Sequence, residues 1–482
     1  MSALSHAKRP HYALTFAVLT LAALAFALLQ SMVAPALPEM QHALHTSPTG
    51  VSWILTAYLL TASVATPIAG RLGDMFGKER VLVIVLAALT VGTVISALST
   101  SIGPMLVGRG IQGIGGAVFP LGIGIVRDEF PKARVATGIG LISATFAVGG
   151  GFGIVAAGPI VQHLDYHYLF WIPLVAVALA LVATWLFVPE SPVRSPGRVN
   201  WLGASLLSGW LVAILLGFSE APTWGWLSPR VIGLFAVGLV LLAVWVWAES
   251  RSSEPLVDMK MMVVRGVWTV NLATLLIGFG MYNSFILIPQ FVELPKSTGF
   301  GFGASVTGAG LFLLPTTVLM LVSSPIAGRM AGRVGSRVPL ILGAGFSAAA
   351  FALLAVAHSA RWEVYLAAAI LGIGIGLAFA SMANLIVEAV SSQMTGVATG
   401  MNTIARTVGG ALGTTIAASI VDASLTSSGL PRETGFTIAF ALCAAALVVG
   451  VLASMIVPRP AARATVAAAT QRASGSLADD TA

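Results

Sequence analysis

Long apolar runs alternate with short polar connections along almost the whole chain. A helix of about 20 apolar residues crosses the roughly 30 Å hydrocarbon core of a bilayer, so each run predicts one transmembrane helix. Fourteen runs reach this length. They lie near residues 14–35, 50–70, 81–99, 104–126, 135–159, 167–188, 201–219, 230–248, 267–291, 305–328, 338–357, 362–387, 396–421 and 434–457.

The composition excludes an ordinary soluble protein. Of the 482 residues, 57% are hydrophobic and 9% are charged, whereas roughly a quarter of the residues of a soluble protein are charged. The 52 glycines suit close packing of helices in lipid. The single cysteine, Cys443, lies in an apolar run and is expected to be a core residue, without disulfide or metal chemistry. The pattern predicts an all-α polytopic membrane protein.

Two polar connections divide the runs into groups. One, rich in Pro, Arg and Ser, follows the sixth run, and a longer one follows the eighth. We expect a cytoplasmic N-terminus at 1–13, an N-terminal six-helix bundle at 14–188, two inserted helices at 201–248, a cytoplasmic linker at 249–266 and a C-terminal six-helix bundle at 267–457. The Ala-, Ser- and Thr-rich tail at 458–482 is expected to be disordered and cytoplasmic.

The two bundles carry related sequence. The stretch Pro67–Arg71 recurs residue for residue as Pro325–Arg329, and Val135–Gly138 recurs as Val397–Gly400. Two echoes at nearly the same offset indicate two related halves rather than chance. The echoed connections lie eight spans apart, which is the spacing that two six-span halves with a two-span insertion between them would give.

The distribution of charge predicts the orientation. Of the 25 lysines and arginines, two lie within apolar runs, and Arg230, Lys296, Arg361 and Arg432 lie in connections on one side of the membrane. The remaining nineteen lie on the side of the N-terminus. Basic connections are retained in the cytoplasm, so both termini are expected there. The net charge of +7 then indicates a basic cytoplasmic face rather than nucleic-acid binding.

Several motifs resemble those of the major facilitator superfamily. The connection between the second and third spans is similar to that family's signature and reads Gly70-x-Leu72-x-Asp74-x-x-Gly77-Lys78-x-Arg80. The fourth span resembles a family pattern and reads Leu106-x-x-Arg109-x-x-Gln112-Gly113-x-Gly115-Gly116. A glycine-rich span with an embedded arginine, 395–413, is a further resemblance. The fourteen-span layout is similar to the drug:proton antiporter branch, so the resemblance implies a major facilitator fold of two six-helix bundles plus two inserted helices.

The sequence departs from that branch at two places. The fifth span reads Gly149–Ile154 where the branch has a Gly-Pro followed by paired glycines, and Gly158-Pro159 comes only later. The first span of the branch carries an aspartate before an Ala-Leu-Pro ending. Here Ala36–Pro38 is present, but the preceding stretch, Leu28–Met32, holds no acid.

A gating role is implied by the resemblance for the charged connections. Asp74 is expected to contact the terminus of a helix in the facing half, with the nearby basic residues forming a latch at the cytoplasmic face. The alternative is that these charges only set topology. The gating candidates are Gly70, Arg71, Asp74, Gly77, Lys78 and Arg80, with Gly328, Arg329 and Gly335 in the second copy.

Polar residues inside apolar runs are costly in hydrocarbon, and they therefore mark cavities or helix-bracing hydrogen bonds. Arg109 lies about one turn inside its span with Gln112 one turn further on, and Arg406 lies mid-span. Each can face a substrate cavity or brace neighbouring helices. The candidates for a substrate-binding or coupling cavity are Gln30, Arg109, Gln112, Asn271, Asn283 and Arg406, with Trp53 and Tyr58 as further lining candidates.

Proton coupling ordinarily needs a carboxyl group whose pKa burial can shift. No acid falls in the middle of a predicted span. Glu39 at the outer mouth and Asp128 at the inner end of the fourth span are the coupling candidates, and coupling itself is implied by the resemblance alone.

The resemblance implies a secondary transporter that exports hydrophobic or amphipathic compounds by alternating access, with export driven by the proton gradient. An uncoupled facilitator or lipid exporter of the same fold, and a non-transporting membrane scaffold, are the alternatives. The sequence contains no Gly-x-x-x-x-Gly-Lys-[Ser/Thr] motif, so it does not indicate an ATPase. We expect neither an enzymatic activity nor a bound cofactor or metal. We expect a monomer in the cell membrane whose partners are a small molecule, protons and lipid.

Overall fold

The computed structural model describes residues 12–191, 193–195, 199–426 and 429–458. Within these residues, fourteen helical segments are long and apolar enough to cross a membrane. Each coincides with one of the expected spans, so the all-α fold class with two bundles and two inserted helices is confirmed. The expected disordered tail, apart from Pro458, and most of the expected N-terminal segment lie outside the described residues.

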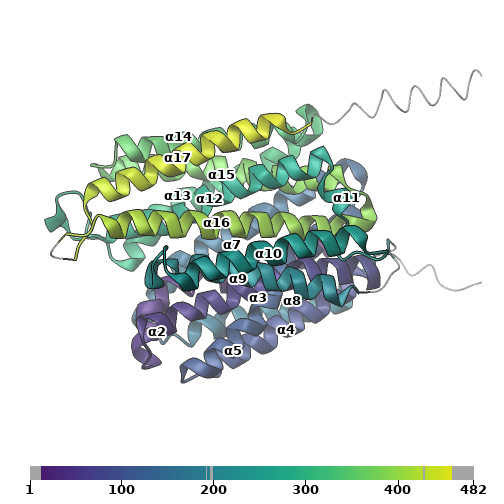
Figure 1. Cartoon of the computed structure of the whole chain (residues 1–482), viewed down its shortest axis with the longest axis horizontal. Helices are drawn as coiled ribbons and strands as arrows, with labels where there is room; N and C mark the ends of the chain where they lie inside the picture. The colour runs from purple at the N-terminus through teal and green to yellow at the C-terminus, as the bar shows by residue number, and fades with distance from the viewer. Residues whose placement is uncertain (1–11, 192, 196–198, 427–428, 459–482) are drawn as a thin grey trace, which may run out of the picture.

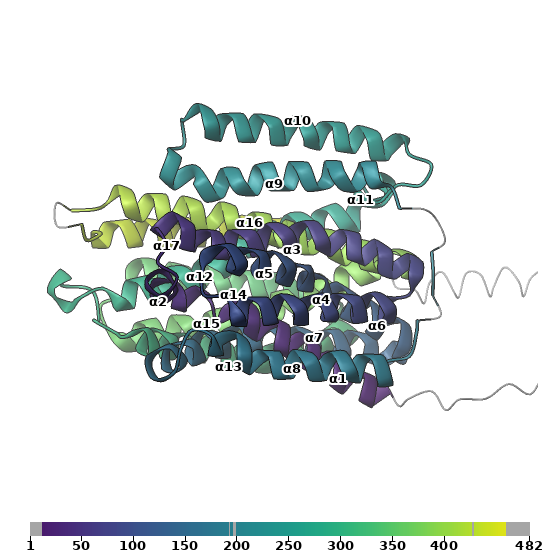
Figure 2. The ribbon, with the colours of Figure 1, turned by 90° about the horizontal axis from the view of Figure 1, so that it is seen from below.

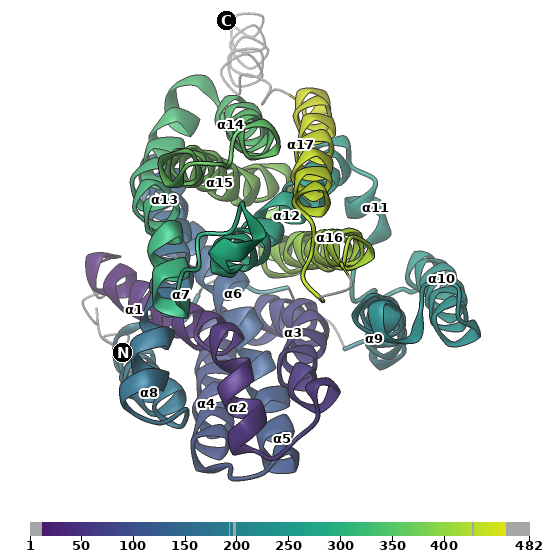
Figure 3. The same ribbon diagram turned by 90° about the vertical axis from the view of Figure 1, so that its left-hand side faces the viewer.

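The N-terminal bundle contains six spans and lies together on one side of the molecule (Figure 3). Its first span is bent by a short 3-10 turn, and its fourth is made of two α-helices joined by another. The elements are α1 (Tyr12–Ser31), η1 (Ala34–Ala36), α2 (Leu37–Ala43), α3 (Pro48–Phe76), α4 (Lys78–Leu98), α5 (Ile102–Gly113), η2 (Ile114–Ala117), α6 (Val118–Glu129), α7 (Lys132–His163) and α8 (Tyr168–Phe187).

The C-terminal bundle faces it across the centre of the molecule, and a helical pair stands at one edge. The inserted pair is α9 (Trp201–Trp224) and α10 (Pro229–Arg251), followed by the short α11 (Met259–Met262). The bundle comprises α12 (Arg265–Glu293), η3 (Lys296–Thr298), α13 (Val306–Val334), α14 (Arg337–Val356), α15 (Arg361–Ala389), η4 (Ser392–Met394), α16 (Thr395–Ala423) and α17 (Glu433–Ile456).

Local sequence explains where several of these helices begin and end. Ser47, Asn200, Ser228 and Ser305 each precede a helix, and each side chain accepts a hydrogen bond from a backbone N–H of the first turn. The connection between the second and third spans is shorter than the gap between the predicted spans 50–70 and 81–99, because α3 continues to Phe76 and α4 begins at Lys78. The whole reversal is made at Gly77, whose φ of 113° disfavours other residues.

Glycines bring the two bundles into contact along α7 and α13. A Cβ on Gly140 would lie 2.8 Å from the Ser324 carbonyl oxygen, and one on Gly328 would lie 2.7 Å from the Ala136 carbonyl oxygen. At the other end of the same crossing, a Cβ on Gly158 would lie 2.6 Å from the Thr307 hydroxyl oxygen. Because these positions cover almost the full length of both helices, α7 and α13 form a continuous seam between the halves.

The second crossing, between α3 and α16, is close at one end only. A Cβ on Gly70 would lie 2.4 Å from the Gly396 carbonyl oxygen, and Gly400 packs on Pro67. Every residue from Thr395 to Asn402 is buried, whereas buried and partly exposed positions alternate towards the other end of α16. This crossing is therefore sealed where α3 ends and α16 begins.

The inserted helix α9 runs alongside α3 and α16 (Figure 2), and its C-terminal part contacts the looser end of that crossing. The Ser219 hydroxyl is 3.0 Å from the Thr56 hydroxyl of α3, and the Thr415 hydroxyl of α16 donates to the Phe218 carbonyl oxygen at 3.2 Å. The Trp226 indole N–H donates to Ser419 at 2.8 Å. A single helix of the inserted pair thus contacts both bundles.

We expect Gly409→Ala to destabilise the protein, because the new Cβ would lie 1.9 Å from the Leu275 carbonyl oxygen of α12 and a backbone must move. The expected cost is about 1–3 kcal/mol. Gly345→Ala is the matched control, since nothing lies within 4 Å of its Cβ. Thermal unfolding in detergent should show a lower midpoint for the first variant only; equal midpoints would contradict the packing described here.

Candidate functional site

Asp74 joins the two bundles. Its carboxylate lies near the end of α3, is 1% exposed, and accepts hydrogen bonds from the backbone N–H groups of Gly396 and Val397, both at 3.1 Å. Those N–H groups belong to the first turn of α16, where they have no partner within the helix. The carboxylate therefore satisfies two donors of the facing half and lies at the positive end of that helix dipole.

Within its own half, Asp74 belongs to a buried ion cluster with Lys78 and Asp128. The Lys78 ammonium is fully buried and lies 2.7 Å from an Asp128 carboxylate oxygen and 3.4 Å from Asp74. The Ser191 hydroxyl donates to the same Asp128 oxygen. One cation thus serves two carboxylates, which leaves Asp74 free to use its oxygens across the interface.

The remaining charges of the predicted latch are peripheral. Arg71 donates to the Ser195 hydroxyl at 3.3 Å, and Ser195 donates through its backbone N–H to the Asp74 carbonyl oxygen at 2.7 Å. Arg80 pairs with Glu190 at 3.0 Å but is 59% exposed. Such an exposed pair contributes little, typically up to about 1 kcal/mol.

The second copy of the motif is not a second charged latch. In the register that aligns Gly70 with Gly328, Gly332 stands for Asp74 and Ser336 for Lys78. Gly328 packs against Ala136 of α7, Gly335 makes the tight turn with a φ of 82°, and Arg329 is exposed. The expected gating role of Gly328, Arg329 and Gly335 is therefore corrected, because the second copy has no acid at the position of Asp74 and its glycines serve packing and the turn.

Another basic residue reinforces the sealed end. Arg127, near the end of α6, donates to the carbonyl oxygens of Val390 at 2.7 Å and Ser391 at 3.0 Å, and to the Thr395 hydroxyl at 2.6 Å. These acceptors follow the C-terminus of α15 and begin α16, so one arginine of the N-terminal half holds two helix ends of the other half. From the sequence, Arg127 was expected only to be one of the basic residues that set the topology.

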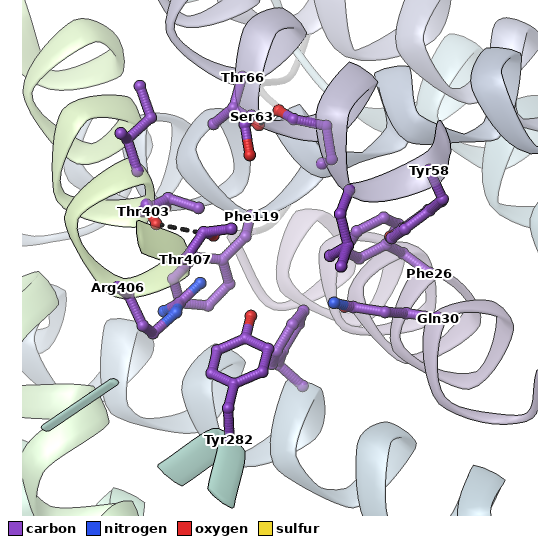
Figure 4. A pocket seen from close by; sticks show the side chains of 15 residues that line it. Phe26, Gln30, Tyr58, Ser63, Thr66, Phe119, Tyr282, Thr403, Arg406 and Thr407 are labelled. Carbon is purple, nitrogen blue, oxygen red and sulfur yellow. Dashed lines mark hydrogen bonds between the residues drawn. The ribbon is translucent and has the colours of Figure 1, made fainter. Parts of the chain in front are cut away.

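A cavity lies between the halves, further along α3 and α16 than Asp74 (Figure 4). Residues of both bundles line it. The polar members are Gln30 from α1, Tyr58, Ser63 and Thr66 from α3, Tyr282 from α12, and Thr403, Arg406 and Thr407 from α16. The side chains of Phe26, Phe119 and Phe146 also line the cavity and form its aromatic wall.

Arg406 points into this cavity from α16, opposite Gln30. Its guanidinium carbon lies 4.5 Å from the centre of the Phe379 ring and within 6.0 Å of the Phe119 and Phe146 ring centres. These rings come from both halves, since Phe119 and Phe146 belong to the N-terminal bundle and Phe379 to α15. The cation is thus held on aromatic faces at the centre of the interface.

Arg109 and Gln112 do not face the cavity, which corrects their interpretation as lining residues. Both are fully buried inside the N-terminal bundle. Arg109 donates to the Ile54 carbonyl oxygen at 3.2 Å and to Gln112 at 2.8 Å, and Gln112 donates to Thr93 at 3.1 Å. The network ties α3, α4 and α5 together, which matches the helix-bracing alternative.

Asn271 and Asn283 also serve packing within one half. The Asn402 amide donates to Asn271 at 2.9 Å and to Thr274 at 2.8 Å, joining α12 to α16. Asn283 is fully buried and donates to the Phe279 carbonyl oxygen of its own helix. Neither lines the cavity described here, so of the six cavity candidates only Gln30 and Arg406 do so.

The two coupling candidates lie in different surroundings. Glu39 is exposed on the short helix α2, whereas Asp128 is held by Lys78 and Ser191 at the sealed end. Neither is a cavity-lining residue.

Sequence reasoning missed Tyr282, Ser63, Thr66 and the phenylalanine wall. Ser63 and Thr66 stood as small polar positions within an apolar run, and Tyr282 directly precedes the flagged Asn283. A helical-face analysis could have singled out these polar residues. The phenylalanines carry no signal of this kind, because an aromatic residue in an apolar run is equally suited to lipid or core.

Two six-helix bundles with a cavity at their interface and a polar contact sealing one end define the class of alternating-access membrane transporters. Comparison with known proteins identifies the family. The sequence profile of the Major Facilitator Superfamily matches residues 19–414 and 270–479. This chain belongs to the Major Facilitator Superfamily.

Individual relatives agree with this assignment. The chain is 30% identical to the tetracenomycin C resistance and export protein of Streptomyces glaucescens over 394 residues, which are 81% of this chain and 72% of that protein. It is 27% identical to the multidrug resistance protein Stp of Mycobacterium tuberculosis over 82% of this chain and 73% of that one. The crystal structure of the human organic anion transporter MFSD10 shares the fold, with a TM-score of 0.68 at 16% identity, covering 92% of this chain and all of that one.

We expect Lys78→Met to destabilise the protein strongly, because two carboxylates would remain buried without their cation. Breaking a buried ion pair from one side costs about 3–5 kcal/mol. The double variant Lys78→Met/Asp128→Asn should recover a large part of the lost stability, since it removes one uncompensated charge. Thermal unfolding midpoints in detergent measure both; a double variant no more stable than the single one would contradict the cluster.

Proposed function

We propose that this protein exports hydrophobic or amphipathic small molecules across the cell membrane by alternating access. The observation that carries the proposal is the contact of Asp74 with α16, which seals one end of an interface whose middle is a partly aromatic cavity. The relatives named as resistance and export proteins support export as the direction.

The sealed end is proposed to be the cytoplasmic one. Its side carries the basic residues that the positive-inside rule assigns to the cytoplasm, and α1 begins and α17 ends on the same side. In this state the cavity is shielded from the cytoplasm. Breaking the Asp74 and Arg127 contacts would separate α3 and α6 from α15 and α16 and admit substrate from that side.

The mechanism needs one crossing to stay packed while the other opens. The α7–α13 seam is packed through glycines along nearly its whole length, whereas α3 and α16 are tightly joined only near Asp74. We propose that the halves rock about the α7–α13 seam. Transport by a single chain needs no second copy, so the working unit is proposed to be a monomer.

We further propose that export is driven by protons and that the Asp74–Lys78–Asp128 cluster takes the proton. Asp74 is a buried carboxylate that contacts both halves, so its protonation would weaken its acceptor strength towards α16 and loosen the seal. Glu39 is not suited to this role because it is exposed and does not line the cavity.

Two alternatives predict different results. An uncoupled facilitator or lipid exporter would show flux without proton movement, and the mainly uncharged cavity wall is compatible with it. A scaffold would show no flux at all.

Asp74→Asn is expected to lower export of a panel of hydrophobic dyes at least tenfold at unchanged surface expression. An amide is uncharged and offers one oxygen where the carboxylate serves two N–H donors. Dye efflux from energised cells measures the effect. Arg80→Gln is the matched control and should keep more than half of the activity, because its ion pair is exposed.

The same variant should open the sealed end. In a Cys443→Ser background, Thr399→Cys places a thiol at a position that is 3% exposed, one turn beyond Gly396. Asp74→Asn should raise its rate of maleimide labelling about tenfold, a shift of about 1.4 kcal/mol in the opening equilibrium. Unchanged labelling together with unchanged efflux would refute the latch.

Proton coupling is tested in proteoliposomes that enclose a pH-sensitive dye. A substrate gradient imposed on the wild-type protein should move protons, and Glu39→Gln should leave the pH change intact. Asp74→Asn should abolish the pH change, and Asp128→Asn should reduce it severalfold. Substrate flux without any pH change in the wild-type protein would favour the facilitator alternative.

A further inference from the structure

The cavity contains a cation, Arg406, to which the described part of the chain supplies no carboxylate partner. Arg406 is 6% exposed, lines the cavity and has a buried Nε–H group that finds no hydrogen-bond acceptor. Among the described residues, no acidic side chain lines the cavity or forms a salt bridge with Arg406. The polar group that faces its guanidinium is the Tyr282 hydroxyl.

The surroundings of the cavity add positive potential. Tyr58 lines the cavity with part of its ring, and the guanidinium carbon of Arg109 lies 4.4 Å from the centre of that ring. Arg109 is bonded to uncharged groups only, namely the Ile54 carbonyl oxygen and Gln112. Two arginines thus act on the same space, and neither has a described carboxylate as counter-ion.

A guanidinium buried in a low-dielectric interface is costly unless an anion compensates it. The three phenylalanine faces around Arg406 offset part of this cost. They are also flat apolar surfaces on which a ring system can pack. The site therefore combines an uncompensated planar cation, which pairs well with carboxylate or phenolate oxygens, with an aromatic wall.

We propose that the preferred substrates are aromatic molecules that carry a negative charge, a carboxylate or phenolate, which pairs with Arg406. The aromatic body lies against Phe26, Phe119 and Phe146, and Tyr282 and Gln30, which line the cavity from α12 and α1, donate hydrogen bonds to the substrate. Lipophilic cations are disfavoured, because they would enter a site with positive potential. This inference rests on the proposed export function and specifies its substrate class.

Two dyes of nearly the same shape test the charge preference. Fluorescein is an anion and rhodamine 123 a cation, and both are xanthenes with a phenyl substituent. Binding to the purified full-length protein in nanodiscs is followed by fluorescence anisotropy. The wild-type protein should bind fluorescein at least tenfold more tightly than rhodamine 123. Equal binding, tighter binding of rhodamine 123, or no binding of fluorescein would overturn the proposal.

Two variants locate the preference. Arg406→Gln should weaken fluorescein binding at least tenfold. Gln30→Glu is nearly isosteric, places a carboxylate opposite Arg406, and should weaken fluorescein and strengthen rhodamine 123 severalfold. Arg80→Gln, far from the cavity, should change neither dye. Fluorescein binding that stays within twofold of wild type in Gln30→Glu would overturn the proposal even if Arg406→Gln fails to fold.

Transport of the same dyes in proteoliposomes separates this inference from the function on which it rests. Export of rhodamine 123 but not of fluorescein would leave the export function standing and overturn the substrate class. A protein that binds fluorescein with the expected preference but moves neither dye would retain the binding site and lose the export function.

Discussion

The arrangement of the two halves depends on a carboxylate of one half that occupies the N-terminus of a helix in the other. Free backbone N–H groups at a helix start are obligatory donors, and in the closed interface, where Asp74 is 1% exposed, no bulk water reaches them. Asp74 satisfies two of them on α16 while Lys78 balances its charge. Water can replace such a polar contact once the interface opens, so the contact is strong when dry and yet reversible.

This contact occurs at only one of the two crossings between the halves, because the duplicated halves differ in sequence at the corresponding positions. The duplicated half has glycine and serine where Asp74 and Lys78 stand, and its α13 packs on α7 through glycines instead. One crossing is thus a glycine-packed seam along nearly its whole length, and the other is held by a polar contact next to a cavity. The inserted helix α9 contacts both halves beside the second crossing, at the end away from Asp74.

Much of this could be read from the sequence, because hydrophobic length and charge asymmetry are physical requirements of a spanning helix. The duplication indicated two related bundles, and Asp74 was identified through its motif.

The residues that line the cavity were predicted poorly. Arg109 and Asn283 are as polar as Arg406, and sequence cannot tell which face of a helix meets a cavity and which meets a neighbouring helix in the same bundle. The phenylalanine wall depends on contacts between α6, α7 and α15, which no local pattern encodes.

The most direct measurement is of two distances at once, by pulsed electron resonance between spin labels in a Cys443→Ser background. One pair, at Phe76 and Gln393, spans the Asp74 end, and the other, at Gly103 and Thr434, spans the opposite end; all four residues are exposed. The account predicts that conditions favouring turnover lengthen the first distance and shorten the second in the same molecules. Two fixed distances, or two that lengthen together, would contradict alternating access through this interface.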